Sequence, residues 1–181
     1  MAIYVPERYQ DDHLDRYVAG PLSRGNVDRD HLAGEGQDGT GFQVGLIALT
    51  KGDQAKAQQL FGNAAGVNEL SEALGVLYLE QGEYAKAVNS FGSVKTNNAA
   101  LAQILVKDYS KASQTLNGVA NPDAVTSYLK AVVAARTNDA NGVINNLKAA
   151  IAADKNMAKE AAIDLEFAKY ATNSDFAALV K

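Results

Sequence analysis

After residue 41, apolar and small residues are grouped in short segments that end at Gly, Asn or Asp. Such segments are typical of helices separated by tight turns, in which Gly and Asn accept left-handed backbone angles and Asn caps helix ends. We predict ten helices, with residue ranges 42–51, 54–65, 68–81, 84–95, 98–106, 109–118, 122–137, 140–153, 157–171 and 174–180. The fold class predicted from the pattern is therefore all-α.

The pattern repeats along the chain. The segment 45–57 recurs 30 residues later as 75–87, and the pair Phe61-Gly62 recurs as Phe91-Gly92. More degenerate copies follow at 107–116, 138–147 and, as a half-unit near the C-terminus, 167–176. A fixed period near 30 residues is typical of stacked helical hairpins.

The repeated positions have a physical role in such a stack. Small residues allow antiparallel helices to approach closely, and they are Gly45, Ala57, Gly75 and Ala87. Phe61 and Phe91 are expected to fill the space between neighbouring hairpins. Gly52 and Gly82 are expected to take the positive φ that ends the first helix of each pair.

These residues resemble the tetratricopeptide repeat. In the second unit, six residues match its pattern in order, and they are Gly75, Tyr78, Gly82, Tyr84, Ala87 and Phe91. In the first unit the matching residues are Gly45, Gly52, Ala57, Phe61 and Ala64. The family's Trp and terminal Pro are absent, and the third copy follows after only 25 residues. The resemblance implies a right-handed α-solenoid of about four and a half hairpins over residues 42–181.

In this family the first helices of the repeats line an inner groove that binds peptides. The corresponding positions here are Phe42, Leu46, Leu49, Glu69, Glu72, Val76, Leu79, Val125, Tyr128, Val132 and Asp164. Their mixture of apolar side chains and carboxylates suits an amphipathic or extended peptide. In the alternative interpretation, the aliphatic members simply pack the first helix against its neighbour. The Lys and Asn of the family's clamp for a C-terminal carboxylate are missing, so we do not expect that ligand.

Residues 1–41 differ in composition from the rest of the chain. They contain eight acidic residues and four Arg, a net charge of −4, whereas 42–181 contain 13 acidic and 13 basic residues and are neutral. A short helix can begin at Pro6 and end before Gly20. The stretch 20–41 has six Gly and few apolar residues, so we predict a low-complexity leader or linker.

Two motifs in this leader have a simpler explanation than a ligand site. The sequence Gly34–Gly39 fits the dinucleotide fingerprint G-x-G-x-x-G, but that fingerprint functions after a β-strand, and none is predicted here. The segment 11–15 contains three Asp and His13, which could bind a metal, yet it is better explained as a solvated helix face. We predict neither a cofactor nor a metal.

Composition excludes several classes of site and partner. The chain has no cysteine for a disulfide or a thiolate metal site, and no apolar run approaches the roughly 20 residues of a membrane span. The neutral repeat region lacks a basic surface for nucleic acid. The other histidine, His31, has no serine partner in a suitable turn, so no catalytic set is predicted.

We therefore predict a non-enzymatic interaction module that binds a protein or peptide in the inner groove. The alternative is the C-terminal organising array of a larger bacterial cell-envelope protein, without a free ligand of its own. Its Lys-, Ala- and Asn-rich repeats resemble bacterial proteins of that kind, which favours the periplasm or cell envelope over the cytoplasm.

Overall fold

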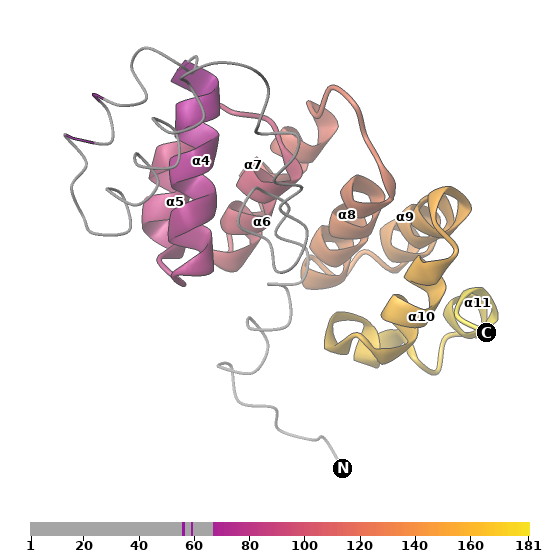
Figure 1. Ribbon diagram of the computed structural model, residues 1–181. Helices are drawn as coiled ribbons and strands as arrows, with labels where there is room; N and C mark the ends of the chain where they lie inside the picture. Colours follow the sequence, from indigo (N-terminus) through magenta and orange to yellow (C-terminus); the bar gives the residue numbers. More distant parts are fainter. Residues whose placement is uncertain (1–55, 57–58, 60–66) are drawn as a thin grey trace. The chain divides into compact units, whose positions relative to one another are not determined.

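The computed structural model describes residues 56, 59 and 67–181, and the secondary structure within them is entirely helical. The elements are α4 (Val67–Glu80), α5 (Tyr84–Phe91), α6 (Asn97–Leu105), α7 (Tyr109–Asn117), α8 (Ala124–Arg136), α9 (Ala140–Ala153), α10 (Asn156–Ile163), the 3₁₀ helix η2 (Leu165–Tyr170) and α11 (Ser174–Leu179) (Figure 1). The described residues belong to two compact units, one containing 67–94 and the other 95–181. The predicted all-α fold class is confirmed for this part of the chain.

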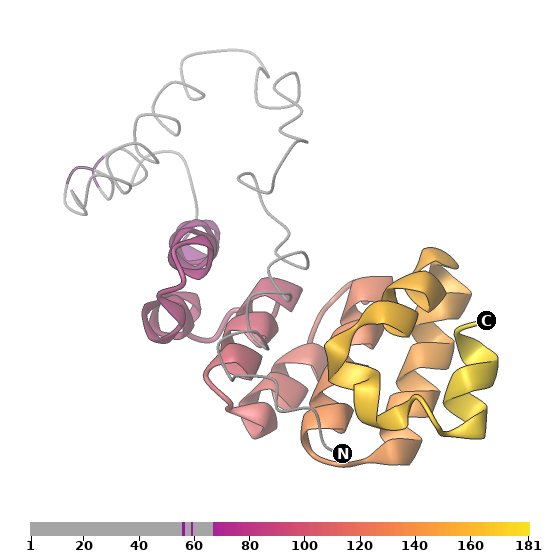
Figure 2. The same cartoon turned by 90° about the horizontal axis from the view of Figure 1, so that it is seen from below.

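The unit that contains 67–94 is built on the hairpin of α4 and α5, which lie side by side (Figure 1, Figure 2). The two helices touch where Gly75 on α4 faces the ring of Phe91 on α5. A Cβ atom added to Gly75 would lie 2.5 Å from that ring, so only glycine allows this approach. The small residue at 75 therefore lets the two helices approach closely, as predicted, but the Phe91 ring lies against Gly75 within its own hairpin, whereas it was predicted to fill the space between neighbouring hairpins.

The unit that contains 95–181 has two further hairpins, α6–α7 and α8–α9. The turns of all three hairpins share one backbone geometry. Each has a left-handed residue after the first helix, namely Gly82 (φ 73°), Lys107 (φ 65°) and Asn138 (φ 62°). The residue that follows donates its N–H back to the first helix in bonds of 2.8 Å, from Glu83 to Tyr78 O, from Asp108 to Gln103 O and from Asp139 to Ala134 O. This pairing is a Schellman turn, which satisfies carbonyls at the end of the first helix.

Buried residues occupy the same positions relative to each turn. In each hairpin a small residue is buried seven positions before the left-handed residue, and these residues are Gly75, Ala100 and Ala131. Nine residues after the left-handed residue stands a large buried residue, which is Phe91, Leu116 or Leu147. Removing such side chains from water is the main stabilisation available to short helices. The three hairpins therefore repeat both their turns and their packing.

Aspartate side chains cap the first turns of α7, α8 and α9. Asp108 accepts the N–H of Lys111 on α7, and Asp139 accepts the N–H of Gly142 on α9. At α8, Asp123 accepts the N–H of Thr126 at 2.7 Å while the Thr126 hydroxyl accepts the N–H of Asp123 at 3.0 Å. This reciprocal capping box pairs two N–H groups that the helix itself leaves without partners.

The predicted helix 157–171 is wrong, because the chain breaks at Asp164 into α10 and η2. The Asp164 backbone is extended (φ −77°, ψ 125°), and its side chain accepts the N–H of Glu166 at 3.0 Å. A side chain that binds the backbone two residues ahead competes with the helix hydrogen bonds. The competing bond therefore ends α10 and starts η2.

Other boundaries differ less from the prediction. The helix predicted over 84–95 ends at Phe91, since Gly92 takes a positive φ of 56°. The helix predicted over 122–137 begins after its N-cap, Asp123. The predicted leader 1–41 and the helices 42–51 and 54–65 lie outside the described residues, except that 56 and 59 are helical.

Candidate functional site

The predicted groove residues have different positions in the structure. Phe42, Leu46 and Leu49 lie outside the described residues, and Glu69 lies on α4. Glu72 and Val125 are half-buried. The remaining five are buried, and they are Val76, Leu79, Tyr128, Val132 and Asp164. Burial agrees with the alternative interpretation for the aliphatic residues, and the groove stays a prediction.

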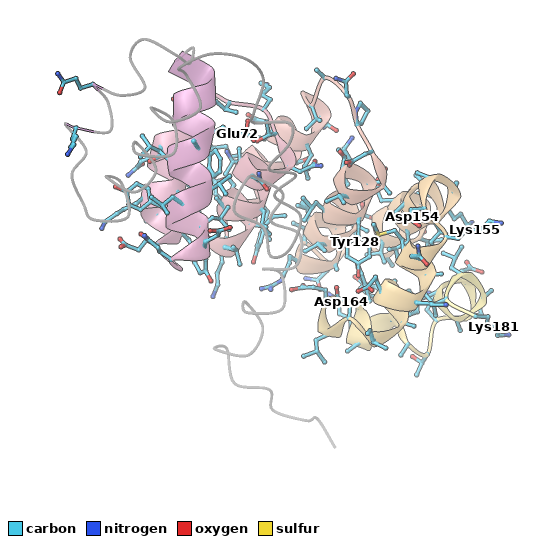
Figure 3. The ribbon with its side chains drawn as sticks, in the orientation of Figure 1. Glu72, Tyr128, Asp154, Lys155, Asp164 and Lys181 are labelled. Carbon is cyan, nitrogen blue, oxygen red and sulfur yellow. The ribbon has the colours of Figure 1, made fainter. Side chains whose placement is uncertain are left out.

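Tyr128 and Asp164 are brought together from distant parts of the sequence. Figure 3 shows the two side chains pointing toward each other, and the Tyr128 hydroxyl donates to Asp164 Oδ2 at 2.7 Å. The Phe167 ring meets Tyr128 edge-on, with 5.5 Å between the ring centroids. Asp164 is therefore a buried, hydrogen-bonded carboxylate in the core of this unit, and not a solvated acid.

Two more polar contacts connect η2 to α8. Arg136 donates from Nε and Nη2 to the two oxygens of Glu166, in a bidentate ion pair whose side chains are largely buried. Lys169 donates to Ala135 O at 2.6 Å and to Asn138 Oδ1 at 2.7 Å. A cation at these carbonyls is favourable because the C-terminal end of a helix is partly negative. The end of α8 is thus fixed by side chains from η2.

The sequence prediction left out four residues that belong beside the groove positions. Leu101 and Ile104 occupy the positions of α6 that correspond to Val76 and Leu79 of α4, counted back from the left-handed residue of each turn. Both are buried. The repeat spacing was the signal that could have found them. Ile163 and Leu165 flank Asp164, with 73% and 50% of their surfaces exposed. Because a continuous helix was predicted there, this exposed pair could not be recognised from the sequence.

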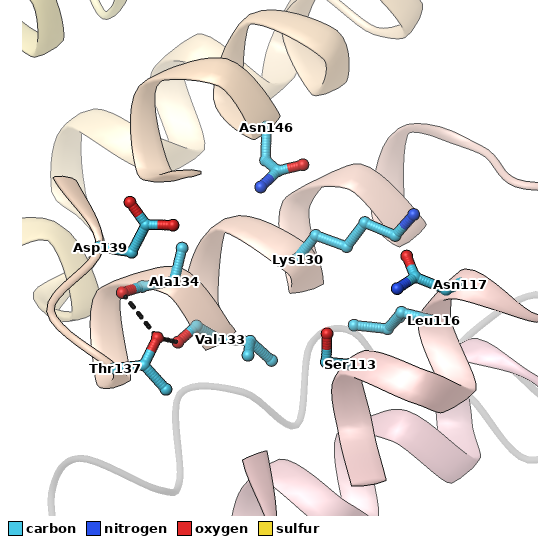
Figure 4. Close-up of a pocket in the computed structure, with 9 residues that line it drawn as sticks. All are labelled: Ser113, Leu116, Asn117, Lys130, Val133, Ala134, Thr137, Asp139 and Asn146. Atoms are coloured by element: carbon cyan, nitrogen blue, oxygen red, sulfur yellow. Dashed lines mark hydrogen bonds between the residues drawn. The ribbon is translucent and has the colours of Figure 1, made fainter. Parts of the chain in front are cut away.

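A second feature is a cleft of about 300 Å³ in the unit that contains 95–181 (Figure 4). It lies between the second helices α7 and α9, over the side of α8. Its floor consists of Leu116, Val133 and Ala134, which are buried and apolar. Its polar lining residues are Ser113, Asn117, Lys130, Thr137, Asp139 and Asn146.

The polar groups of the cleft differ in how they are bonded. The Thr137 hydroxyl donates to Val133 O at 2.9 Å, and the Asn146 amide donates to Gly142 O at 2.8 Å. Asp139 uses one carboxylate oxygen to cap α9. Within the described residues, no ion pair or hydrogen bond is found for Lys130. In the described part of the chain, Lys130 is therefore a positive charge at the cleft without an ion-pair partner.

The remaining candidate chemistry is limited. Among the described residues, no group of three or more His, Cys, Asp or Glu side chains is arranged to hold a metal ion. In the same part of the chain, no helix combines the length and apolar character that a bilayer span requires. The segment 11–15 and the glycine motif 34–39, for which no ligand was predicted, lie outside the described residues.

Comparison with known proteins gives no family assignment. No family model, no curated protein and no solved structure matches the chain.

Proposed function

We propose that the chain is a non-enzymatic scaffold of tetratricopeptide-like hairpins, arranged as a right-handed solenoid that binds a protein or peptide along its first helices. The supporting observation is that three hairpins share one turn geometry and one set of buried positions. Hairpins built on one plan can stack so that each contacts its neighbours, which leaves an extended binding surface.

The partner would contact the accessible side chains next to the buried groove positions. In the unit that contains 95–181, Tyr128, Val132 and Asp164 form a packed support. Val125 is half-buried, while Ile163 and Leu165 are exposed beside Asp164. Exposed aliphatic side chains over a rigid support suit the apolar face of an amphipathic or extended peptide.

Selection of displayed random peptides on the intact 181-residue chain tests this proposal. The unaltered chain is expected to enrich peptides that carry apolar residues at regular spacing. The double variant Ile163→Ser/Leu165→Ser is expected to lose that enrichment because it removes the exposed apolar pair. Val106→Ser is the matched control, since Val106 is also exposed but lies at the end of α6.

The outcomes separate the two interpretations of the array. Enrichment that survives in the double variant would place the binding surface elsewhere. If the unaltered chain enriches no peptide, free-peptide binding is contradicted, and the organising role within a larger protein becomes the better proposal. Circular dichroism of both variants should match the unaltered chain, because substitutions at exposed positions usually change stability by no more than about 0.5 kcal/mol.

A further inference from the structure

The cleft between α7 and α9 has hydrogen-bond donors at one edge. Lys130 extends from α8 toward Asn117 on α7 (Figure 4), and Ser113 lines the same edge one turn earlier on α7. An ammonium, a hydroxyl and an amide can together donate to one carboxylate. A hydrogen bond between charged groups is shorter and roughly twice as strong as one between neutral groups.

Acceptors lie at the opposite edge of the cleft. Asn146 donates one amide hydrogen to Gly142 O on α9, and its side-chain oxygen can accept from a ligand. Asp139 caps α9 through one oxygen, and its carboxylate has a second oxygen. Peptide N–H groups are donors that fit this edge. The cleft therefore has a cationic side chain, Lys130, at one edge and a carboxylate, Asp139, at the other.

Between the two edges, the floor is apolar and already packed. Leu116, Val133 and Ala134 are each at most 8% exposed, so a ligand would meet a fixed surface. A volume of about 300 Å³ is at the lower end of the range for small-molecule sites. Such a space accommodates one or two residues of a peptide.

We propose that this cleft is a second peptide-binding site, which takes a segment with an aliphatic residue next to Asp or Glu. The acidic side chain binds Lys130, Ser113 and Asn117, and the aliphatic side chain lies on Leu116 and Val133. The cleft is lined by residues of α7, α8 and α9, none of which is a predicted groove position, so it is separate from that groove. It adds recognition of a negative charge that the exposed aliphatic pair at 163 and 165 does not provide.

The probes are the blocked dipeptides acetyl-Leu-Glu-amide and acetyl-Leu-Gln-amide, titrated at millimolar concentration into the intact chain with labelled Leu and Val methyl groups. The Glu peptide is expected to shift the NMR signals of Leu116 and Val133 and to bind about tenfold more tightly than the Gln peptide. Lys130→Met keeps the length of the side chain and is expected to abolish that preference. Lys148→Met is the control, because Lys148 is exposed on α9 and does not line the cleft.

Three results would overturn the proposal. These are an absence of shifts at Leu116 and Val133, equal affinities for the two peptides, and an unchanged preference in Lys130→Met. Each is independent of the peptide selection, which tests the exposed pair at 163 and 165. Because Met is a good helix former, Lys130→Met is expected to fold, and Lys130→Arg should retain the preference if its charge is what matters.

Discussion

The hairpin α8–α9 and the C-terminal segment α10–η2–α11 are consecutive in one unit, yet they are stabilised differently. The helices α8 and α9 have 13 and 14 residues, and an aspartate side chain caps each of them. By contrast, α10, η2 and α11 have only 8, 6 and 6 residues, and Ala161 is the one buried residue of α10. The α8–α9 hairpin therefore contains its own caps and core.

The C-terminal segment depends on contacts with its neighbour. Its buried rings, Phe167 and Tyr170, follow the break at Asp164, and its polar side chains bind α8. Nothing comparable is required for α8 to begin, because its capping box is local. The comparison indicates that a degenerate repeat of short helices can keep its place through specific tertiary contacts.

The largest expected effect comes from Phe167→Ala. This ring lies between Tyr128 and Phe176, at centroid distances of 5.5 and 6.0 Å, and its removal leaves a cavity. We expect a loss of about 3–5 kcal/mol in the free energy of unfolding, measured by urea denaturation. Ile163→Ala, at an exposed position nearby, should change it by less than about 0.5 kcal/mol. Similar small effects of both variants would show that the segment is not packed as described.

A smaller loss is expected for Tyr128→Phe. The variant removes the hydroxyl that donates to the buried Asp164, and a hydrogen bond to a charged group contributes about 1.5–3 kcal/mol. Hydrogen exchange should become faster in η2 while α9 changes little, since only the C-terminal segment depends on this bond. Tyr109→Phe on α7 is the control, because Tyr109 is only half-buried. Equal acceleration in α9 would contradict the difference between the two regions.

The turn of the α8–α9 hairpin can be tested at Asn138. Its φ of 62° is left-handed, so Asn138→Ala should be less stable than Asn138→Gly by about 1–2 kcal/mol, in thermal or urea unfolding. Both variants lose the acceptor for Lys169, so their difference reports the backbone alone. Thr172, which precedes the N-cap Asn173, has no positive φ. At that position Gly should give no advantage over Ala.

The smallest effect is expected at the first cap of the hairpin. Burial would raise the pKa of Asp123, but the bonds from Thr126 and Asn97 outweigh it and lower the pKa below its ordinary value. The carboxylate therefore stabilises the folded chain above the ordinary pKa, and this contribution is lost as the pH falls below about 4. Asp123→Asn, also a good N-cap, should change stability little at pH 7 and make acid unfolding less steep. An unchanged acid profile would contradict this role of the cap.

The sequence was sufficient for features with a local cause. The left-handed angle at Gly82 follows from the residue type at a helix end, and Asn138 was expected at a turn for the same reason. Eight of the predicted helices fall on described residues, and seven of them correspond to single helices, six with shifted ends and one, 140–153, with the same ends as α9. The apolar residues and the turn residues that define each of these helices lie within a few sequence positions of each other, so the local sequence is enough to predict the helix.

Features that depend on distant residues could not be predicted in this way. The burial of Asp164 involves its hydrogen bond with Tyr128, 36 positions earlier, and the residues next to Asp164 in the sequence give no information on that partner. The cleft is lined by residues from three helices, and the sequence around Lys130 does not distinguish it from a solvated surface lysine. Burial of the groove positions likewise depends on which neighbours pack against them.

The contact between Gly75 and Phe91 also has an evolutionary consequence. The small position and the large position of each hairpin are occupied by Gly with Phe at 75 and 91, and by Ala with Leu at 100 and 116 and at 131 and 147. A ring that touches the backbone leaves no volume for a methyl group, whereas the smaller leucine is compatible with alanine. The two positions should therefore covary in related sequences, so that an alanine at 75 accompanies an aliphatic residue at 91.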